Sequence, residues 1–75
     1  MTYKIDYKKV VDTARVLSDR IDQVITPDMV YSELQNHAED VENHGYDYQT
    51  WLDTVNVSVM ALWLQRLYNT GILFR

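Results

Sequence analysis

Glu33, His37, Asp40 and His44 come nearest, among the residues of this chain, to the spacing of a metal site. Side chains three or four positions apart are neighbours on a helix, so all four would lie along one side of it. Imidazole and carboxylate ligands suit zinc, iron or manganese. One helix rarely supplies a full set of ligands, and this spacing matches no zinc or di-iron motif. We therefore expect two histidines lying among acids, with no metal and no other cofactor.

Groups for covalent or acid–base catalysis are scarce. The chain has no cysteine, and its serines have no glycine elbow around them. Ser32 and His37 are five positions apart and would not face each other on a helix. There is no glycine-rich loop for a phosphate group. The sequence predicts that the protein is not an enzyme.

Acidic residues dominate the middle of the chain. Between Ile21 and Gln65 there is no lysine or arginine, and the formal net charge of the whole chain is −4. Direct binding of nucleic acid is disfavoured, because phosphate contacts require clusters of basic side chains. Such a face ordinarily keeps a small protein soluble, but its field would also steer the protein towards a basic partner. The acids of this window are Asp22, Asp28, Glu33, Glu39, Asp40, Glu42, Asp47 and Asp53.

Aromatic residues follow the densest group of these acids. Tyrosine and tryptophan dominate binding hot spots, because they bury a large area with few rotatable bonds. The alternative is that these aromatics close one end of a helical bundle. If the chain has a recognition surface, we expect it at this junction. The predicted partner-binding residues are Glu33, Glu39, Asp40, Glu42, Tyr46, Asp47, Tyr48 and Trp51.

Apolar residues in the first third of the chain recur at the spacing of a helix. Their pattern predicts a helix over about residues 3–25, with Thr2 as a candidate cap. Thr26 and Pro27 end this helix and begin a second one over about 27–43, because proline fits the first helical position but not the interior. Gly45 is a natural stop for it. The stripe of the first helix is Tyr3, Tyr7, Val10, Ala14, Leu17, Ile21 and Val24, and the inner face of the second is Val30, Tyr31, Leu34, Ala38 and Val41.

A third helix is predicted over about residues 48–69, with Asp47 as its N-cap. Residues 54–59 alternate in polarity and are rich in β-branched side chains, which is typical of a strand. No second stretch offers a partner strand, so we favour a continuous helix. Gly71 would end the helix. The apolar tail over 71–75, with Ile72, Leu73 and Phe74, then either folds back onto the helix end or forms an exposed hook for a partner.

The pattern as a whole predicts an all-α protein, a small three-helix antiparallel bundle in a single domain over 1–75. We expect the third helix to be the most buried, because residues 59–64 are six apolar residues in a row and such a helix needs cover on every side. This run is far shorter than the roughly 20 residues of a membrane span, and the chain begins with no signal segment. We expect a cytoplasmic protein that does not enter membranes.

Three hypotheses for function follow from these features. The first is a small acidic protein-binding module that modulates or inhibits a partner with a basic surface. An inhibitor of a nucleic-acid-binding host protein, encoded by a phage or mobile element, would have this character. The second is a structural homo-oligomer assembled through the third helix and the apolar tail. The third is a helical metal-binding protein.

Overall fold

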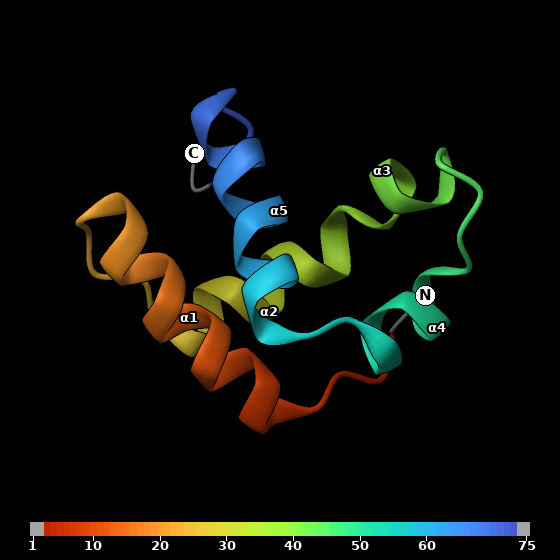
Figure 1. The fold of residues 1–75 in the computed structure, drawn as a ribbon, viewed down its shortest axis with the longest axis horizontal. Helices are drawn as coiled ribbons and strands as arrows, with labels where there is room; N and C mark the ends of the chain where they lie inside the picture. Colours follow the sequence, from red (N-terminus) through yellow and green to blue (C-terminus); the bar gives the residue numbers. More distant parts are fainter. Residues whose placement is uncertain (1–2, 74–75) are drawn as a thin grey trace.

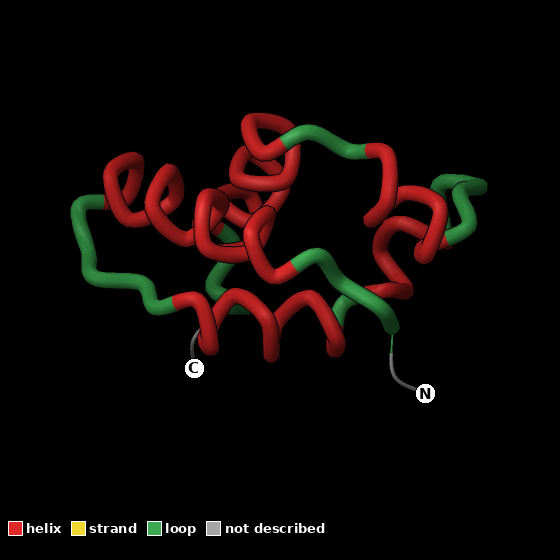
Figure 2. The backbone as a smooth tube through the Cα atoms, turned by 90° about the horizontal axis from the view of Figure 1, so that it is seen from below, coloured by secondary structure: helices red, strands yellow, loops and turns green. Residues whose placement is uncertain are grey.

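The computed structural model describes residues 3–73 as an all-helical chain. The helices are joined by loops, with no strand over the described residues, which confirms the predicted fold class (Figure 2). The arrangement differs from three continuous helices, because the second and third predicted helices are each broken once. The five helices are α1 Tyr7–Ile21, α2 Pro27–Asn36, α3 Ala38–Glu42, α4 Tyr48–Thr54 and α5 Val57–Asn69 (Figure 1).

The core lies where α1 packs against α5 and α2. Helix α5 contributes more buried residues than any other helix: Met60, Ala61, Trp63, Leu64 and Leu67. The apolar stripe predicted along the first helix is buried only in its middle, at Val10, Ala14 and Leu17. Tyr3 and Ile21 are partly buried against the core, whereas Tyr7 is 55% exposed and Val24 is 88% exposed.

The segment before α1 is extended, although the pattern predicts a helix from residue 3. Two glutamine side chains hold it. The Gln35 amide accepts from Tyr3 N–H and donates to the Tyr3 carbonyl, both at 2.9 Å. The Gln49 amide pairs with Lys4 in the same way, at 2.9 and 2.7 Å. Asp6 then caps α1, its side chain accepting from Lys8 N–H at 3.0 Å. Long-range side-chain contacts therefore replace the first helical turn.

Helix α1 ends at Ile21, four residues earlier than predicted, and Asp22 is its C-cap. This residue has a left-handed backbone with a φ of 55°, and Gln23 N–H closes the turn on the Ser18 carbonyl at 3.2 Å. The Ser18 hydroxyl also exchanges hydrogen bonds with the backbone of Ile25, at 2.9 and 3.1 Å. The chain from Asp22 to Thr26 is therefore a loop.

We predict that Asp22→Gly raises the free energy of unfolding by about 0.5–1 kcal/mol, because glycine adopts a left-handed backbone without steric cost. The change also removes a negative charge from the negative end of a helix. Asp19→Gly is the matched control: it makes the same change inside α1, where glycine is a poorer helix former than aspartate by a few tenths of a kcal/mol. Urea denaturation followed by circular dichroism measures both variants. Equal destabilisation by the two would contradict the prediction.

The second predicted helix begins as expected, with the Thr26 side chain accepting from Met29 N–H at 3.2 Å, but it breaks at His37. The last carbonyls of a helix need partners from outside it. The Leu34 carbonyl, in the last turn of α2, accepts from the Tyr48 hydroxyl at 2.6 Å. The His37 ring lies 2.9 Å from the Glu33 carboxylate. The break is thus stabilised by a side chain that arrives from α4.

The third predicted helix is interrupted at Val55 and Asn56, within the stretch of alternating polarity. Both residues have extended backbones, and the Asn56 side chain caps α5 by accepting from Val59 N–H at 2.8 Å. Lys9 Nζ donates to the Leu52 carbonyl near the end of α4, at 2.9 Å. The stretch is therefore neither a strand nor part of one continuous helix. Its extended residues form a two-residue joint between two helices.

The end of α5 confirms that the chain folds back after Gly71. Gly71 has a φ of 78° and donates to the Tyr68 carbonyl at 3.0 Å, while Ile72 N–H donates to the Leu67 carbonyl at 3.0 Å. This pair of bonds is the Schellman arrangement, in which a left-handed glycine ends a helix. It places Leu73 in the core, at 4% exposed. The rest of the predicted apolar tail, Phe74 included, lies outside the described residues.

Candidate protein-binding surface

The predicted acids of α3 are open to a partner. Glu39, Asp40 and Glu42 are all exposed on this short helix. Within residues 3–73 no lysine or arginine lies within 4.0 Å of these carboxylates; the ion pair that the structure contains there joins Glu33 and His37. No basic side chain of the described residues therefore neutralises them through an ion pair. This is the electrostatic condition for attracting a cationic partner.

Three of the predicted residues have structural roles instead. Glu33 is half-buried against His37. Asp47 caps α4 by accepting from Thr50 N–H at 3.1 Å, as the sequence predicts. Hydrogen bonds from the Thr50 hydroxyl and backbone hold the pKa of Asp47 below its ordinary value of 3.8. Tyr48 is 1% exposed and belongs to the core. These three residues therefore stabilise the structure around the predicted surface.

The set proposed for a metal is divided by the break at His37. Glu33 of α2 pairs with His37 at the break, whereas His44 Nδ1 lies 2.8 Å from the backbone carbonyl of Asp40. Over residues 3–73 no three histidine or acidic side chains are grouped so that they could hold a metal ion. The helical alignment that motivated the metal hypothesis is therefore absent from this part of the chain.

A groove of about 220 Å³ lies between α3 and α5, beside Trp51 of α4. Its polar lining includes Asp40, whose carboxylate accepts from Trp63 Nε1 at 2.6 Å. This bond fixes α3 against α5 at the side of the groove. The remaining lining residues are Val41, His44, Tyr46, Val59, Leu62 and Arg66. The structure thus brings together Asp40, Tyr46 and Trp51 from the predicted set.

Stacked rings form the wall beneath this groove. The Trp51 and Trp63 rings meet edge to face, with centroids 5.0 Å apart. Tyr48 stacks on Trp51 with centroids 5.7 Å apart and meets Tyr3 edge to face with centroids 4.8 Å apart. Aromatic pairs at such distances each contribute about 0.5–1.5 kcal/mol beyond burial. Tyr48 therefore belongs to the core, as the bundle-closing alternative predicts, whereas Trp51 is half-buried and lines the groove.

The sequence reasoning missed the α5 side of the groove. Val59 and Leu62 are 47% and 50% exposed, and Arg66 follows one turn later. A signal for these residues was present in the apolar run over 59–64. A helix apolar on every side, in a chain too short to cover it, leaves one apolar face in solvent. We had interpreted that run as core or as a surface for a second copy, and not as part of the partner-binding site.

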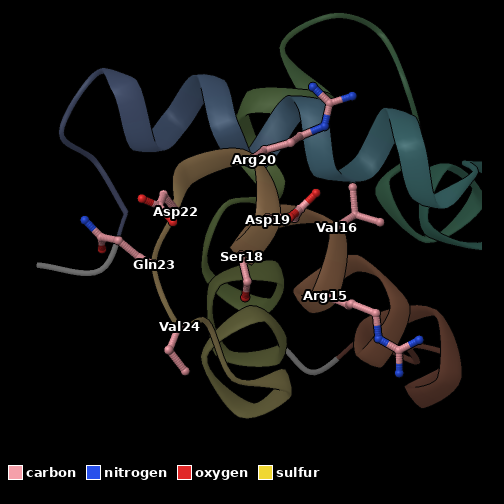
Figure 3. A pocket seen from close by; sticks show the side chains of 8 residues that line it. All are labelled: Arg15, Val16, Ser18, Asp19, Arg20, Asp22, Gln23 and Val24. Atoms are coloured by element: carbon pink, nitrogen blue, oxygen red, sulfur yellow. The ribbon is translucent and has the colours of Figure 1, made fainter.

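A second, wider depression of about 920 Å³ lies at the end of α1. Its side chains diverge rather than converge: Arg15 and Arg20 reach outward on different sides, and Val24 lies on the loop after the helix (Figure 3). Charges of both signs alternate along it, from Arg15 through Asp19 and Arg20 to Asp22. This depression has no set of groups aimed at a common point, so we do not assign it a ligand.

Comparisons with protein-family models, with curated proteins and with solved structures find no match for this chain. Over the described residues, no helix has the length and apolar character needed to cross a membrane. The functional argument therefore rests on the surface around α3, α4 and α5.

Proposed function

We propose that this protein is a small acidic protein-binding module, which modulates or inhibits a partner that presents a basic surface to α3. The observation that carries the proposal is the juxtaposition of unpaired carboxylates on α3 with the aromatic groove behind them. Exposed like charges attract a partner from a distance, and aromatic side chains in a concave site retain it. A nucleic-acid-binding protein is a suitable partner, because carboxylates can occupy its phosphate sites.

The test is a pull-down of the tagged protein from lysate of its source cells, with captured proteins identified by mass spectrometry. The critical variant is Glu39→Lys with Glu42→Lys, which spares Asp40 because its carboxylate holds Trp63. We expect capture of one stoichiometric partner to fall about tenfold or more in this variant, through slower association. Raising the salt concentration should weaken wild-type capture, because it screens exposed charges.

The matched control is Asp19→Lys with Asp22→Lys. It makes the same change in charge on two exposed residues at the end of α1, which lies away from α3 (Figure 1). This control should capture the partner as the wild type does. Equal capture by both charge-reversal variants, or recovery of the tagged chain alone, would contradict the proposal.

A homo-oligomer is the second candidate, because the apolar face of α5 remains partly uncovered. Val59 and Leu62 together expose a short apolar strip. Self-association through this strip predicts a mass in sedimentation equilibrium above the 8.9 kDa of one chain. It also predicts that Leu62→Gln restores the single-chain mass, whereas the double charge reversal on α3 leaves the assembly intact.

A further inference from the structure

The groove between α3 and α5 is too small for a typical cofactor. Its volume of about 220 Å³ lies below the roughly 300–1,000 Å³ of small-molecule sites. It is a hollow in the surface with a partly buried floor, since Trp63 is 9% exposed and Val41 is 5% exposed. Its rim is apolar and open at Val59 and Leu62. These dimensions suit one side chain of a larger partner.

The charges inside the groove and those around it favour different side chains of a partner. Of the described lining residues, Arg66 is a cation and Asp40 is a carboxylate that already accepts from Trp63 Nε1 at 2.6 Å, so the two charges offset each other and the groove offers a lysine or arginine side chain no net attraction. Outside, the unpaired carboxylates of Glu39 and Glu42 favour cations. An apolar side chain flanked by basic residues satisfies both conditions.

We propose that this groove accepts one large apolar side chain from a basic segment of the partner protein. The inference rests on the proposed function, and adds to it the chemistry of the segment that binds. The aromatic floor supplies contact area for the anchor, and the acids of α3 select its neighbours in the sequence. Hot-spot residues commonly have this form, a buried anchor surrounded by a polar rim.

Intrinsic fluorescence provides a direct test, because the two tryptophans of the chain, Trp51 and Trp63, both line the groove. The probe is the synthetic peptide acetyl-KKGFGKK-amide, which has no tryptophan. Its controls are acetyl-KKGAGKK-amide, without the anchor, and acetyl-EEGFGEE-amide, with the opposite charge. We expect the first peptide to bind at least about tenfold more tightly than the alanine peptide, since burying a phenylalanine ring is worth that factor. It should also bind more tightly than the glutamate peptide, because the carboxylates of that control are repelled by those of α3.

Two variants locate the site. Leu62→Gln should reduce binding of the phenylalanine peptide to the level of the alanine peptide, because it makes the rim polar. Val24→Gln is the matched control: it makes a comparable apolar-to-polar change at a residue that is 88% exposed and outside the groove, and it should change nothing. Equal affinity for the phenylalanine and alanine peptides would overturn the inference, as would a dissociation constant weaker than about 1 mM for both.

The inference and the proposed function can fail separately. If the pull-down yields a partner that depends on Glu39 and Glu42 but not on Leu62, the function stands and the groove has no anchor. If sedimentation shows a dimer that Leu62→Gln dissociates, a second copy covers the groove and the inference fails. Loss of a captured partner in Leu62→Gln, with unchanged stability, would support both.

Discussion

Replacing Tyr48 by alanine should destabilise the protein by about 3–5 kcal/mol, the range for removing a buried aromatic side chain. A domain of this length has a free energy of unfolding of about 4–11 kcal/mol, so the substitution removes a large fraction of it. Tyr48 is 1% exposed, is enclosed by Tyr3 and Trp51, and satisfies the Leu34 carbonyl. Urea denaturation followed by circular dichroism measures the loss.

Tyr48→Phe separates the hydroxyl from the ring. It leaves the Leu34 carbonyl without its partner, which costs about 1–3 kcal/mol. The exposed Tyr7→Phe is the control and should change stability little. Equal destabilisation by the two phenylalanine variants would contradict a stabilising role for the hydrogen bond of the Tyr48 hydroxyl.

Tyr48 should also make stability sensitive to alkaline pH. Burial, and to a smaller extent the nearby Tyr3, raises the pKa of Tyr48 in the folded protein. Because the folded pKa is the higher one, this contribution is complete below the unfolded value of about 10 and is lost as the pH rises above it. We expect the free energy of unfolding to fall less steeply above pH about 10 in Tyr48→Phe than in the wild type.

Trp63→Ala is expected to cost a similar amount, about 3–5 kcal/mol, and to detach α3 from α5. The indole ring contacts Trp51 and Tyr48 and donates to Asp40 at 2.6 Å. Leu62→Ala, at the preceding residue of α5, is the matched control. Its side chain is 50% exposed, so its loss should cost less than about 1 kcal/mol. Chemical denaturation measures the loss in the free energy of unfolding for both variants, and equal losses would contradict this interpretation.

Local signals made several features of the fold predictable. Thr26 with Pro27, Asp47 and Gly71 each mark a helix end by a mechanism confined to a few residues, and all three are used as predicted. The inner face of the second predicted helix was also readable from spacing, since Val30, Leu34 and Val41 are buried.

The two helix breaks depend on residues distant in the sequence. No glycine or proline marks His37, and the free carbonyl of Leu34 is satisfied by Tyr48, fourteen residues later. The interruption at Asn56 did have a local signal, the β-branched alternation over 54–59, but this pattern is typical of a strand and does not indicate a helix break. An asparagine cap following a valine was the alternative that we did not weigh.

Only part of the candidate site could be predicted from the sequence, again because the rest depends on residues that are distant in the chain. Asp40, Tyr46 and Trp51 lie near one another in the sequence, so their type and spacing indicated the surface. Val59, Leu62 and Arg66 enter it only because the joint at Val55 and Asn56 lets α5 turn back towards α3. A surface made of two distant segments is visible only in the fold.

The glutamine contacts of the N-terminal segment imply a particular order of local opening. Tyr3 and Lys4 are each held by one glutamine side chain through a closed pair of bonds, without support from a helix or sheet. When one of these residues is released, both of its bonds to the glutamine are lost together. The free energy of this local opening is below that of global unfolding. The release of Tyr3 removes its edge-to-face contact with Tyr48, so this side of the aromatic core opens at a lower free energy than the helices themselves.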